Sequence, residues 1–162
     1  MPPPHEPAER KIVTFSLGDQ MFGIDMSSLV EIREWDAPTP LPGVAPYIKG
    51  VTNLRGNVVP VVGLAERIGW PESKIHARSC ILVVNVGGKQ CGFLVDEVAD
   101  IVPIQSADVQ PAPEVETGEN VLSGLVQVPA RGADGAETDA GTMVSLLDLE
   151  RLSLTRPLDL AA

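Results

Sequence analysis

The feature that most constrains the fold is a repeated frame of glycines and short apolar runs. Residues 14–32, TFSLGDQMFGIDMSSLVEI, align with residues 83–101, VVNVGGKQCGFLVDEVADI, at a shift of 69 positions. In this alignment Gly18 matches Gly87 and Gly23 matches Gly92. The runs between the glycines are short and rich in β-branched residues, which is typical of strands joined by tight turns. The frame predicts that one all-β unit occurs twice in the chain.

A second pair of segments supports the duplication. Residues 56–68, GNVVPVVGLAERI, resemble residues 141–152, GTMVSLLDLERL, and residues 50–54 resemble residues 124–128. Each half then reads as a hairpin, a helical turn, a strand, a second hairpin and a short helix. About five short strands per half suit a small closed barrel better than a large sandwich. We therefore predict an all-β fold of two small five-stranded β-barrels packed together, with short helical turns and a third apolar interface between the barrels.

The prediction divides the chain as follows. Residues 1–10, MPPPHEPAER, read as a disordered tail, and residues 156–162 as a second tail. The two barrel subdomains meet at a boundary near residues 70–80, and exchange of segments between them is left open. Residues 129–141, PARGADGAETDAG, are small, polar and glycine-rich, so they predict a floppy surface loop.

Charge and hydropathy exclude two classes of partner. The net charge is −10, from 22 acidic and 12 basic residues, so the chain lacks the basic stripe that nucleic acid requires. An anionic membrane surface would repel it, and its longest apolar run is far shorter than the roughly 20 residues that span a bilayer. We expect a cytoplasmic protein without direct membrane insertion. Residues 96–139 hold ten acidic residues and one basic residue, which we interpret as a solvated face whose part in binding is left open.

No motif for catalysis or for a cofactor is found. The chain has two histidines and no Cys-x-x-Cys pair, so a metal site is not expected. Residues 85–90, NVGGKQ, predict a hairpin turn and not a phosphate loop, because no helix opens there. Asp96, Glu97 and Asp100 are interpreted as the polar side of an amphipathic segment and not as an acid–base cluster. We expect a protein that is not an enzyme and needs no cofactor.

The two cysteines are expected to stay reduced. A hairpin closed by Gly87-Gly88 places Val84 opposite Cys91, and Cys80 lies four residues further along its strand. At the rise of a strand that is roughly 13 Å, which is too far for a disulfide. We predict two independent buried thiols.

Several motifs together carry a family resemblance. They are FSLGDQMFGID, VEIRE, IKGVTNLRG, VVPVVGL, CGFLVDEVADIV, QPAPE and LLDLERL. Over residues 11–155 the chain resembles the CheW family, the adaptors of bacterial chemotaxis. The resemblance implies two SH3-like barrels without catalytic activity. It also implies two partners, which are the cytoplasmic tip of a chemoreceptor (a methyl-accepting chemotaxis protein) and the CheW-like regulatory domain of the histidine kinase CheA.

The resemblance also implies a receptor-binding set. The matching positions are Arg55, Gly50, Glu31, Leu29 and Val98. An arginine on a short hairpin would have its guanidinium aimed at carboxylates or carbonyls of a receptor helix, with Leu29 or Val98 in apolar contact. Glu31 would orient Arg55 or touch the receptor itself. No kinase-contacting residue is assigned, although exposed apolar strand ends on either barrel are candidates.

One departure from the family pattern and two rival functions remain. Gly63 stands where many relatives have Asp, so the short helix that follows is expected to lack a side-chain cap. The first rival is a CheW-like scaffold in a non-chemotaxis receptor–kinase pathway. The second is a small-ligand sensor or enzyme that uses the groove between the barrels, which would need convergent polar residues with perturbed pKa values. Self-association is left open.

Overall fold

The computed structural model describes residues 9–111, 121–131 and 137–155, and almost all of its regular structure is strand. Its elements are β1 (Glu9–Leu17), β2 (Gln20–Asp25), the 3-10 turn η1 (Met26–Ser28), β3 (Leu29–Glu34), β4 (Ile48–Leu54), β5 (Asn57–Gly63), α1 (Leu64–Arg67), β6 (Cys80–Val86), β7 (Lys89–Val95), β8 (Glu97–Gln105), the 3-10 turn η2 (Ser106–Asp108), β9 (Leu122–Arg131), β10 (Glu137–Leu147) and α2 (Leu149–Thr155).

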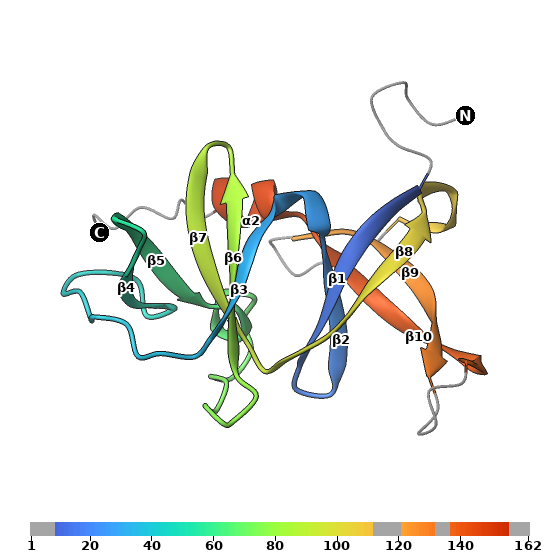
Figure 1. Ribbon diagram of the computed structural model, residues 1–162, viewed down its shortest axis with the longest axis horizontal. Coiled ribbons are helices and arrows are strands. Elements are labelled where there is room, and N and C mark those ends of the chain that lie inside the picture. The colour runs from blue at the N-terminus through green and yellow to red at the C-terminus, as the bar shows by residue number, and fades with distance from the viewer. Residues whose placement is uncertain (1–8, 112–120, 132–136, 156–162) are drawn as a thin grey trace.

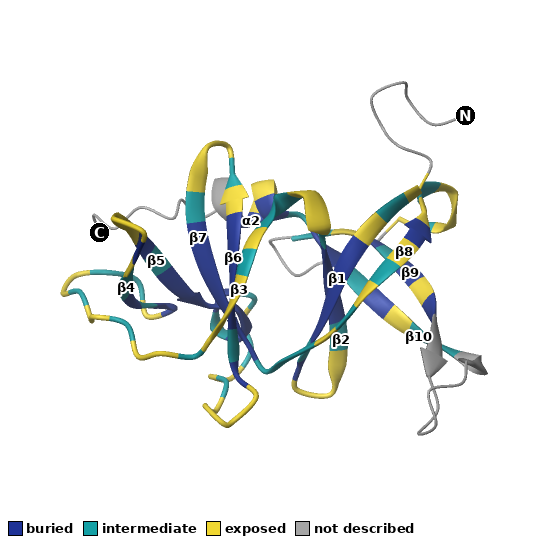
Figure 2. Cartoon of the chain, viewed as in Figure 1, coloured by how far each residue is buried: buried dark blue, intermediate teal, exposed yellow. Residues whose placement is uncertain are grey.

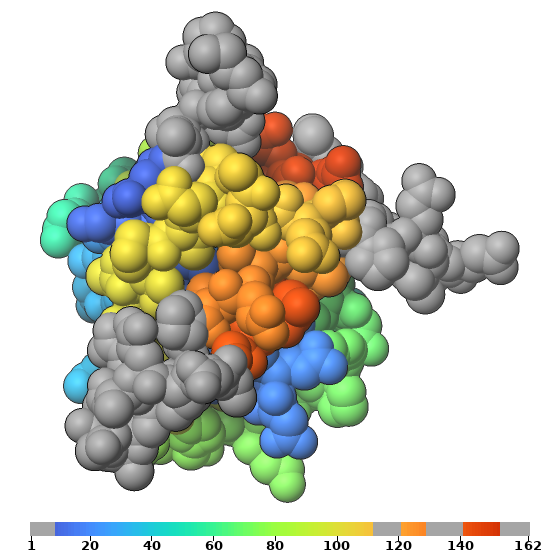
Figure 3. All heavy atoms as spheres, turned by 90° about the vertical axis from the view of Figure 1, so that its right-hand side faces the viewer, coloured from blue at the N-terminus to red at the C-terminus, as the bar shows by residue number. Residues whose placement is uncertain are grey.

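The strands form two five-stranded sheets that lie side by side (Figure 1). Sheet A has the order β8-β1-β2-β10-β9, and sheet B has the order β3-β6-β7-β5-β4. Figure 3 shows the outer end of sheet A, where its two edge strands, β8 in yellow and β9 in orange, lie next to each other and curl the sheet into a barrel. The expectation of two small SH3-like five-stranded barrels is confirmed.

The two sheets are built in the same way but exchange strands between the halves of the chain. If β1 to β5 are matched with β6 to β10, sheet A has the order 3-1-2-5-4 and sheet B has the same order. Sheet A takes its hairpin β1–β2 from the first half and its other strands from the second, and sheet B does the reverse. The segment between Arg67 and Cys80 therefore connects two strands of the same sheet, β5 and β6 of sheet B.

The repeated glycines have the same structural reason in both barrels. Gly23 of β2 pairs in parallel with Leu146 of β10, and Gly92 of β7 pairs in parallel with Val61 of β5. A Cβ atom on Gly92 would lie 2.7 Å from the Ile81 side chain, so the barrel interior leaves no room for one. The glycine frame in the sequence thus reflects close packing at Gly23 and Gly92 and turns with a φ of 59° at Gly18 and Gly87.

Among the described residues, the buried apolar side chains form three clusters. Figure 2 marks the buried residues in dark blue along the strands of both sheets. One fills the inside of sheet A, around Ile12 and Val144, and one fills the inside of sheet B, around Val61 and Val83. The largest, here called the central cluster, takes residues from both sheets and includes Phe15 of β1. Side chains alternate along a strand, so the hairpins β1–β2 and β6–β7 are buried on both faces. The predicted third apolar interface is confirmed.

The helical turns follow local capping rules. The Oδ1 atom of Asp25 accepts a hydrogen bond from the Ser27 N–H at 2.9 Å and caps η1. Gly63 precedes α1 without any side-chain cap, as expected from the departure at this position.

An ion pair uses the space that Gly63 leaves open. A Cβ atom on Gly63 would lie 2.9 Å from Lys49 Cε, and the Lys49 ammonium contacts the carboxylates of Glu66 and, at 3.0 Å, Glu72. Burial lowers the pKa of Lys49, but hydrogen bonds to these two carboxylates outweigh it and raise the pKa above its usual value. The ammonium therefore stays charged.

Two boundaries differ from expectation. β1 begins at Glu9, so Glu9 and Arg10 belong to a strand that pairs with β8 and not to the tail. β9 runs to Arg131 and β10 starts at Glu137, where the two residues pair, so much of segment 129–141 is strand and not loop. Cross-strand pairing extended the hairpin beyond what its composition suggested. Residues 1–8, 132–136 and 156–162 lie outside the described residues.

The cysteines are free thiols in different surroundings. Val84 pairs with Cys91 as predicted, and neither cysteine is in a disulfide. Cys91 is buried, but Cys80 is only half-buried, so the prediction of two buried thiols is wrong for Cys80. Cys80 begins β6 opposite Glu34, near the end of the sheet, which leaves its side chain partly open to solvent.

The central cluster predicts that the two barrels unfold together. Phe93→Ala removes a ring that is 2% exposed, so we expect the free energy of unfolding to fall by about 3–5 kcal/mol in one cooperative transition. Calorimetry checks both points. Val58→Ala, at a side chain that is 65% exposed, is the control and should change stability by less than about 0.5 kcal/mol. Two separate transitions in Phe93→Ala would contradict a shared core.

The thiols are predicted to react at different rates. Burial raises the pKa of Cys91 to about 12, and burial also raises the pKa of Cys80 above its usual value. Because the thiolate is the nucleophile, raising the pKa from 9.0 to about 12 cuts the thiolate fraction at pH 8 by about a thousandfold. Iodoacetamide should therefore alkylate Cys80 in the native protein and Cys91 only in denaturant, as read by peptide mass spectrometry. Equal rates in the native state would show that the central cluster opens readily.

Candidate interaction surface

The β4–β5 hairpin ends in a strained two-residue turn. Arg55 has a φ of 53° and Gly56 a φ of 87°, which is the pattern of a type I′ turn. The side chain of Asn53 accepts a hydrogen bond from the Gly56 N–H at 3.0 Å and supports the turn. Arg55 is the one non-glycine residue with positive φ in the part of the chain that the structure describes. That backbone conformation costs an L-residue about 1–2 kcal/mol.

Arg55 is held by Glu31 and is still open to solvent. The guanidinium lies 3.3 Å from the Glu31 carboxylate, and the Arg55 side chain is 79% exposed. Arg33 lies 3.6 Å from the other oxygen of Glu31. β3 and β4 are the two edges of sheet B, so the Arg55–Glu31 pair joins the hairpin tip to the opposite edge of the sheet. The structure brings these two predicted residues together and gives Glu31 the orienting position.

Leu29 and Val98 lie on the junction between the barrels. Both are half-buried and pack against the central cluster. Leu29 is in β3 and pairs with Val84 of sheet B, whereas Val98 is in β8 and pairs with Phe15 of sheet A. A surface that includes Arg55, Glu31, Leu29 and Val98 therefore draws on both barrels.

Gly50 is placed differently from the other four residues. It is buried, its φ is 145°, and a Cβ atom there would collide with the carbonyl oxygen of Thr39. Thr39 and Val51 exchange backbone hydrogen bonds of 2.8 and 2.9 Å beside it. Gly124, its counterpart in the repeat, meets the backbone of Gln110 in the same way. Gly50 thus holds the preceding loop against β4 and presents no side chain to a partner.

The carboxylates near β8 serve structural roles. Asp96 accepts a hydrogen bond from the Gly18 N–H at 2.7 Å and anchors the β1–β2 turn. Glu97 pairs with Arg78 at 3.0 Å, and Asp100 accepts from the Ile101 N–H at 2.8 Å. Each has a separate local partner, as expected for the polar side of a strand segment. Among the described residues no group of three or more His, Cys, Asp or Glu is placed to hold a metal ion.

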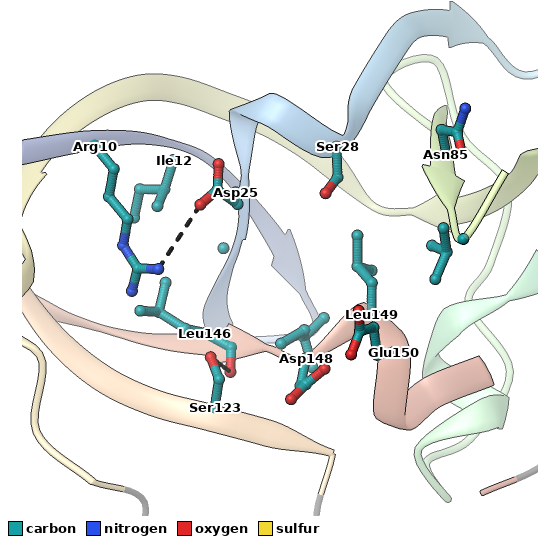
Figure 4. A pocket seen from close by; sticks show the side chains of 14 residues that line it. Arg10, Ile12, Asp25, Ser28, Asn85, Ser123, Leu146, Asp148, Leu149 and Glu150 are labelled. Atoms are coloured by element: carbon teal, nitrogen blue, oxygen red, sulfur yellow. Dashed lines mark hydrogen bonds and ion pairs between the residues drawn. The ribbon is translucent and has the colours of Figure 1, made fainter. Parts of the chain in front are cut away.

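A hollow between the barrels is lined by polar and apolar side chains from both sheets (Figure 4). Arg10 lies 3.7 Å from Asp25, and Asp148 accepts a hydrogen bond from the Arg151 N–H at 3.1 Å. Ile12 and Leu146 lie at its base. Asp25 caps η1 and Asp148 accepts a hydrogen bond at the start of α2, so these two carboxylates have structural roles that do not require a ligand.

Exposed apolar side chains occur at equivalent positions of the two barrels. Ile32 and Ile101 are 42% and 43% exposed, and Val58 and Met143 are 65% and 50% exposed. Each pair matches in the sequence repeat. Exposed apolar strand ends were expected as candidates for kinase contact, but these four residues were not predicted individually. The sequence repeat could have identified them, because apolar residues that recur at equivalent exposed positions of both barrels indicate the same kind of contact in each.

Two SH3-like barrels with an exposed, pre-oriented arginine and paired apolar positions define the class of protein, which is a protein-interaction module. The family model described as a CheW-like domain matches residues 11–155. The chain is 35% identical to chemotaxis protein CheW of Rhizobium meliloti over 141 residues, which is 87% of this chain and 85% of the relative. It is 37% identical to a probable chemotaxis protein CheW of Rhizobium etli, over 89% of this chain and 87% of the relative.

A solved structure agrees. The crystal structure of the scaffolding protein TtCheW from Thermoanaerobacter tengcongensis is similar with a TM-score of 0.75 and 28% identity, over 91% of this chain and 94% of that one. The chain belongs to the CheW-like family, and it is a scaffold or adaptor of the chemotaxis class. In the residues that the structure describes, no helix has the length and hydropathy to cross a membrane.

Relieving the strain at Arg55 is predicted to stabilise the protein. Asn is tolerated in the left-handed region and Asn-Gly is favoured in type I′ turns, while an exposed ion pair contributes little. We expect Arg55→Asn to raise the free energy of unfolding by about 0.5–1 kcal/mol, measured in urea. Arg78→Asn is the matched control, since Arg78 is 72% exposed and also paired with a glutamate, and it should be neutral or slightly destabilising. A lower stability for Arg55→Asn would show that the ion pair outweighs the strain.

Proposed function

We propose that this chain is a non-catalytic adaptor that couples the cytoplasmic tips of chemoreceptors to the regulatory domain of the histidine kinase CheA. In this proposal it works in the cytoplasm and reaches the membrane only through its partners. The observation that carries the proposal is Arg55, which is exposed, ion-paired and held in a strained turn at the position that matches the receptor-facing arginine of the family.

The geometry of Arg55 suits recognition of a helix bundle tip. A guanidinium offers several donors in a planar fork, which can bind carboxylates or backbone carbonyls. The turn and Glu31 restrict its conformations before binding, so less entropy is lost when the partner arrives. Because stability alone would favour Asn or Gly at this turn, an arginine there supports a role in binding.

The other proposed residues support Arg55 in different ways. Leu29 and Val98 are half-buried at the junction of the barrels, where a receptor helix would complete their burial. Gly50 contributes indirectly, by holding the loop before β4 in place. The proposed receptor surface therefore combines one charged anchor with apolar contacts from both barrels.

The kinase is proposed to bind elsewhere. The exposed apolar positions in β3 and β5 of sheet B recur in β8 and β10 of sheet A, so each barrel offers a similar patch. Since the resemblance implies that the regulatory domain of CheA is itself CheW-like, barrel-to-barrel contact between the two proteins is the expected mode. The positions in β8 and β10 lie in the other barrel from Arg55, so a kinase bound there would leave the Arg55 surface to the receptor.

The proposal predicts that Arg55→Glu separates the two binding activities. The substituted glutamate would face Glu31 and repel a carboxylate on the receptor, so we expect receptor affinity to fall by about tenfold or more. Binding to the CheA regulatory domain should stay within about twofold. Titration calorimetry with a cognate receptor tip and a cognate regulatory domain measures both affinities.

Arg78→Glu is the matched control, because Arg78 is equally exposed and ion-paired but lies outside the proposed set. It should bind both partners as the wild type does. If Arg55→Glu binds the receptor normally, the receptor surface is wrong. If the wild type binds neither cognate partner, the adaptor function itself is wrong.

A further inference from the structure

We propose that Arg67 is a positioning residue that holds the two barrels in one relative orientation, and that the receptor surface depends on this orientation. The structural part of the proposal stands on the contacts of Arg67. The binding part rests on the proposed function.

Arg67 is a buried cation between two helices. It is the last residue of α1 and is only 5% exposed. One of its terminal nitrogens donates a hydrogen bond of 2.8 Å to the backbone carbonyl of Leu152 in α2, and its guanidinium lies 5.6 Å from the centre of the Tyr47 ring. Burying a charge is costly, and these contacts offset the cost only while α1, α2 and Tyr47 keep their places.

The two helices belong to different barrels. α1 follows β5 of sheet B, and α2 follows β10 of sheet A. α2 lies against β6 of sheet B, and Leu152 is buried in the central cluster at 1% exposure. The hydrogen bond from Arg67 to Leu152 therefore connects the final segment of sheet A to the body of sheet B.

The connection is reciprocal. Trp70, just after α1, packs edge-on against Phe22 of β2 in sheet A, with the ring centres 5.5 Å apart. The segment after the last strand of each half of the chain, β5 or β10, thus reaches across to the other barrel, and Arg67 joins these two segments to each other.

A hydrogen bond of this kind can control the relative orientation of the two barrels. Apolar contacts in the central cluster stabilise association, but they are not directional. A buried, charged hydrogen bond has a narrow geometry and favours one arrangement over slightly shifted ones. The proposed receptor surface needs one fixed arrangement of the barrels, because Arg55 and Glu31 lie on sheet B while Val98 lies on sheet A.

Distances between the barrels test the structural part. Spin labels on Asp19→Cys in the β1–β2 turn and Lys89→Cys in the β6–β7 hairpin, in a Cys80→Ser background, report the inter-barrel distance by pulsed EPR. Both positions are exposed, and the turns are equivalent in the two barrels. We expect one narrow distance distribution in the wild type and in the control Arg78→Met. Arg67→Met, which keeps the length of the side chain but not its donors, should broaden or shift the distribution.

Binding tests the functional part. At a temperature well below unfolding, we expect Arg67→Met to bind a cognate receptor tip roughly threefold to thirtyfold more weakly, the range seen for positions that act without touching a ligand. Arg67→Lys keeps the charge but not the planar fork, so its distance distribution and affinity should lie between those of wild type and Arg67→Met. A loss of stability alone would not weaken binding by a fully folded variant.

Each outcome decides the proposal. Unchanged distances in Arg67→Met and Arg67→Lys overturn it, and if Arg67→Met does not fold, an unchanged distribution in Arg67→Lys overturns it. Altered distances with normal receptor affinity support Arg67 as the residue that fixes the relative orientation of the barrels, but they overturn its role in binding. If the wild type binds no receptor tip but the distances still change in Arg67→Met, the proposed function is refuted and the structural role of Arg67 is not.

Discussion

The structure depends above all on the apolar packing between the two barrels. The central cluster is the largest of the three described, and it buries the outer faces of both paired hairpins through residues such as Phe15 and Phe93. Each barrel interior is small, around Ile12 in sheet A and Val61 in sheet B, and small cores give little net stability on their own. The shared cluster makes the two barrels one folding unit, and it fixes the junction at which Leu29 and Val98 lie.

The two residues proposed to carry function, Arg55 and Arg67, are places where the local rules of folding are broken. The Arg55 turn retains strain that Asn would relieve, and Arg67 is a charged residue that is only 5% exposed, which is costly. One residue aims a donor outward, and the other holds two helices together. In the two proposals, Arg55 contacts the receptor, and Arg67 keeps the parts of the receptor surface on the two barrels in one relative position.

Much of the fold could be predicted because the same sequence pattern occurs in both halves of the chain. Gly18 and Gly23 recur as Gly87 and Gly92, and this repeat was enough to predict two five-stranded barrels and the core between them. The repeat could not show that the halves exchange strands, since both arrangements satisfy the same hydrophobic pattern. Gly50 was grouped with the surface residues from resemblance, although its reason is the backbone of Thr39. Arg67 was missed, because a helix-ending arginine looks like a solvated one until its partner, a carbonyl 85 residues away, is seen.

The exchange of strands has a consequence for synthesis on the ribosome. Sheet B needs β6 and β7, so no barrel can be completed until Val95 has left the exit tunnel, although five strands are already outside. Until then Val13, Phe15 and Leu17 on β1 have no central cluster to enter. The β1–β2 hairpin therefore stays without this core while residues 26–95 are added to the chain. Residues 1–95 hold nine acidic and nine basic residues, so the net charge of −10 comes from the residues after Val95 and does not repel neighbouring copies during that wait.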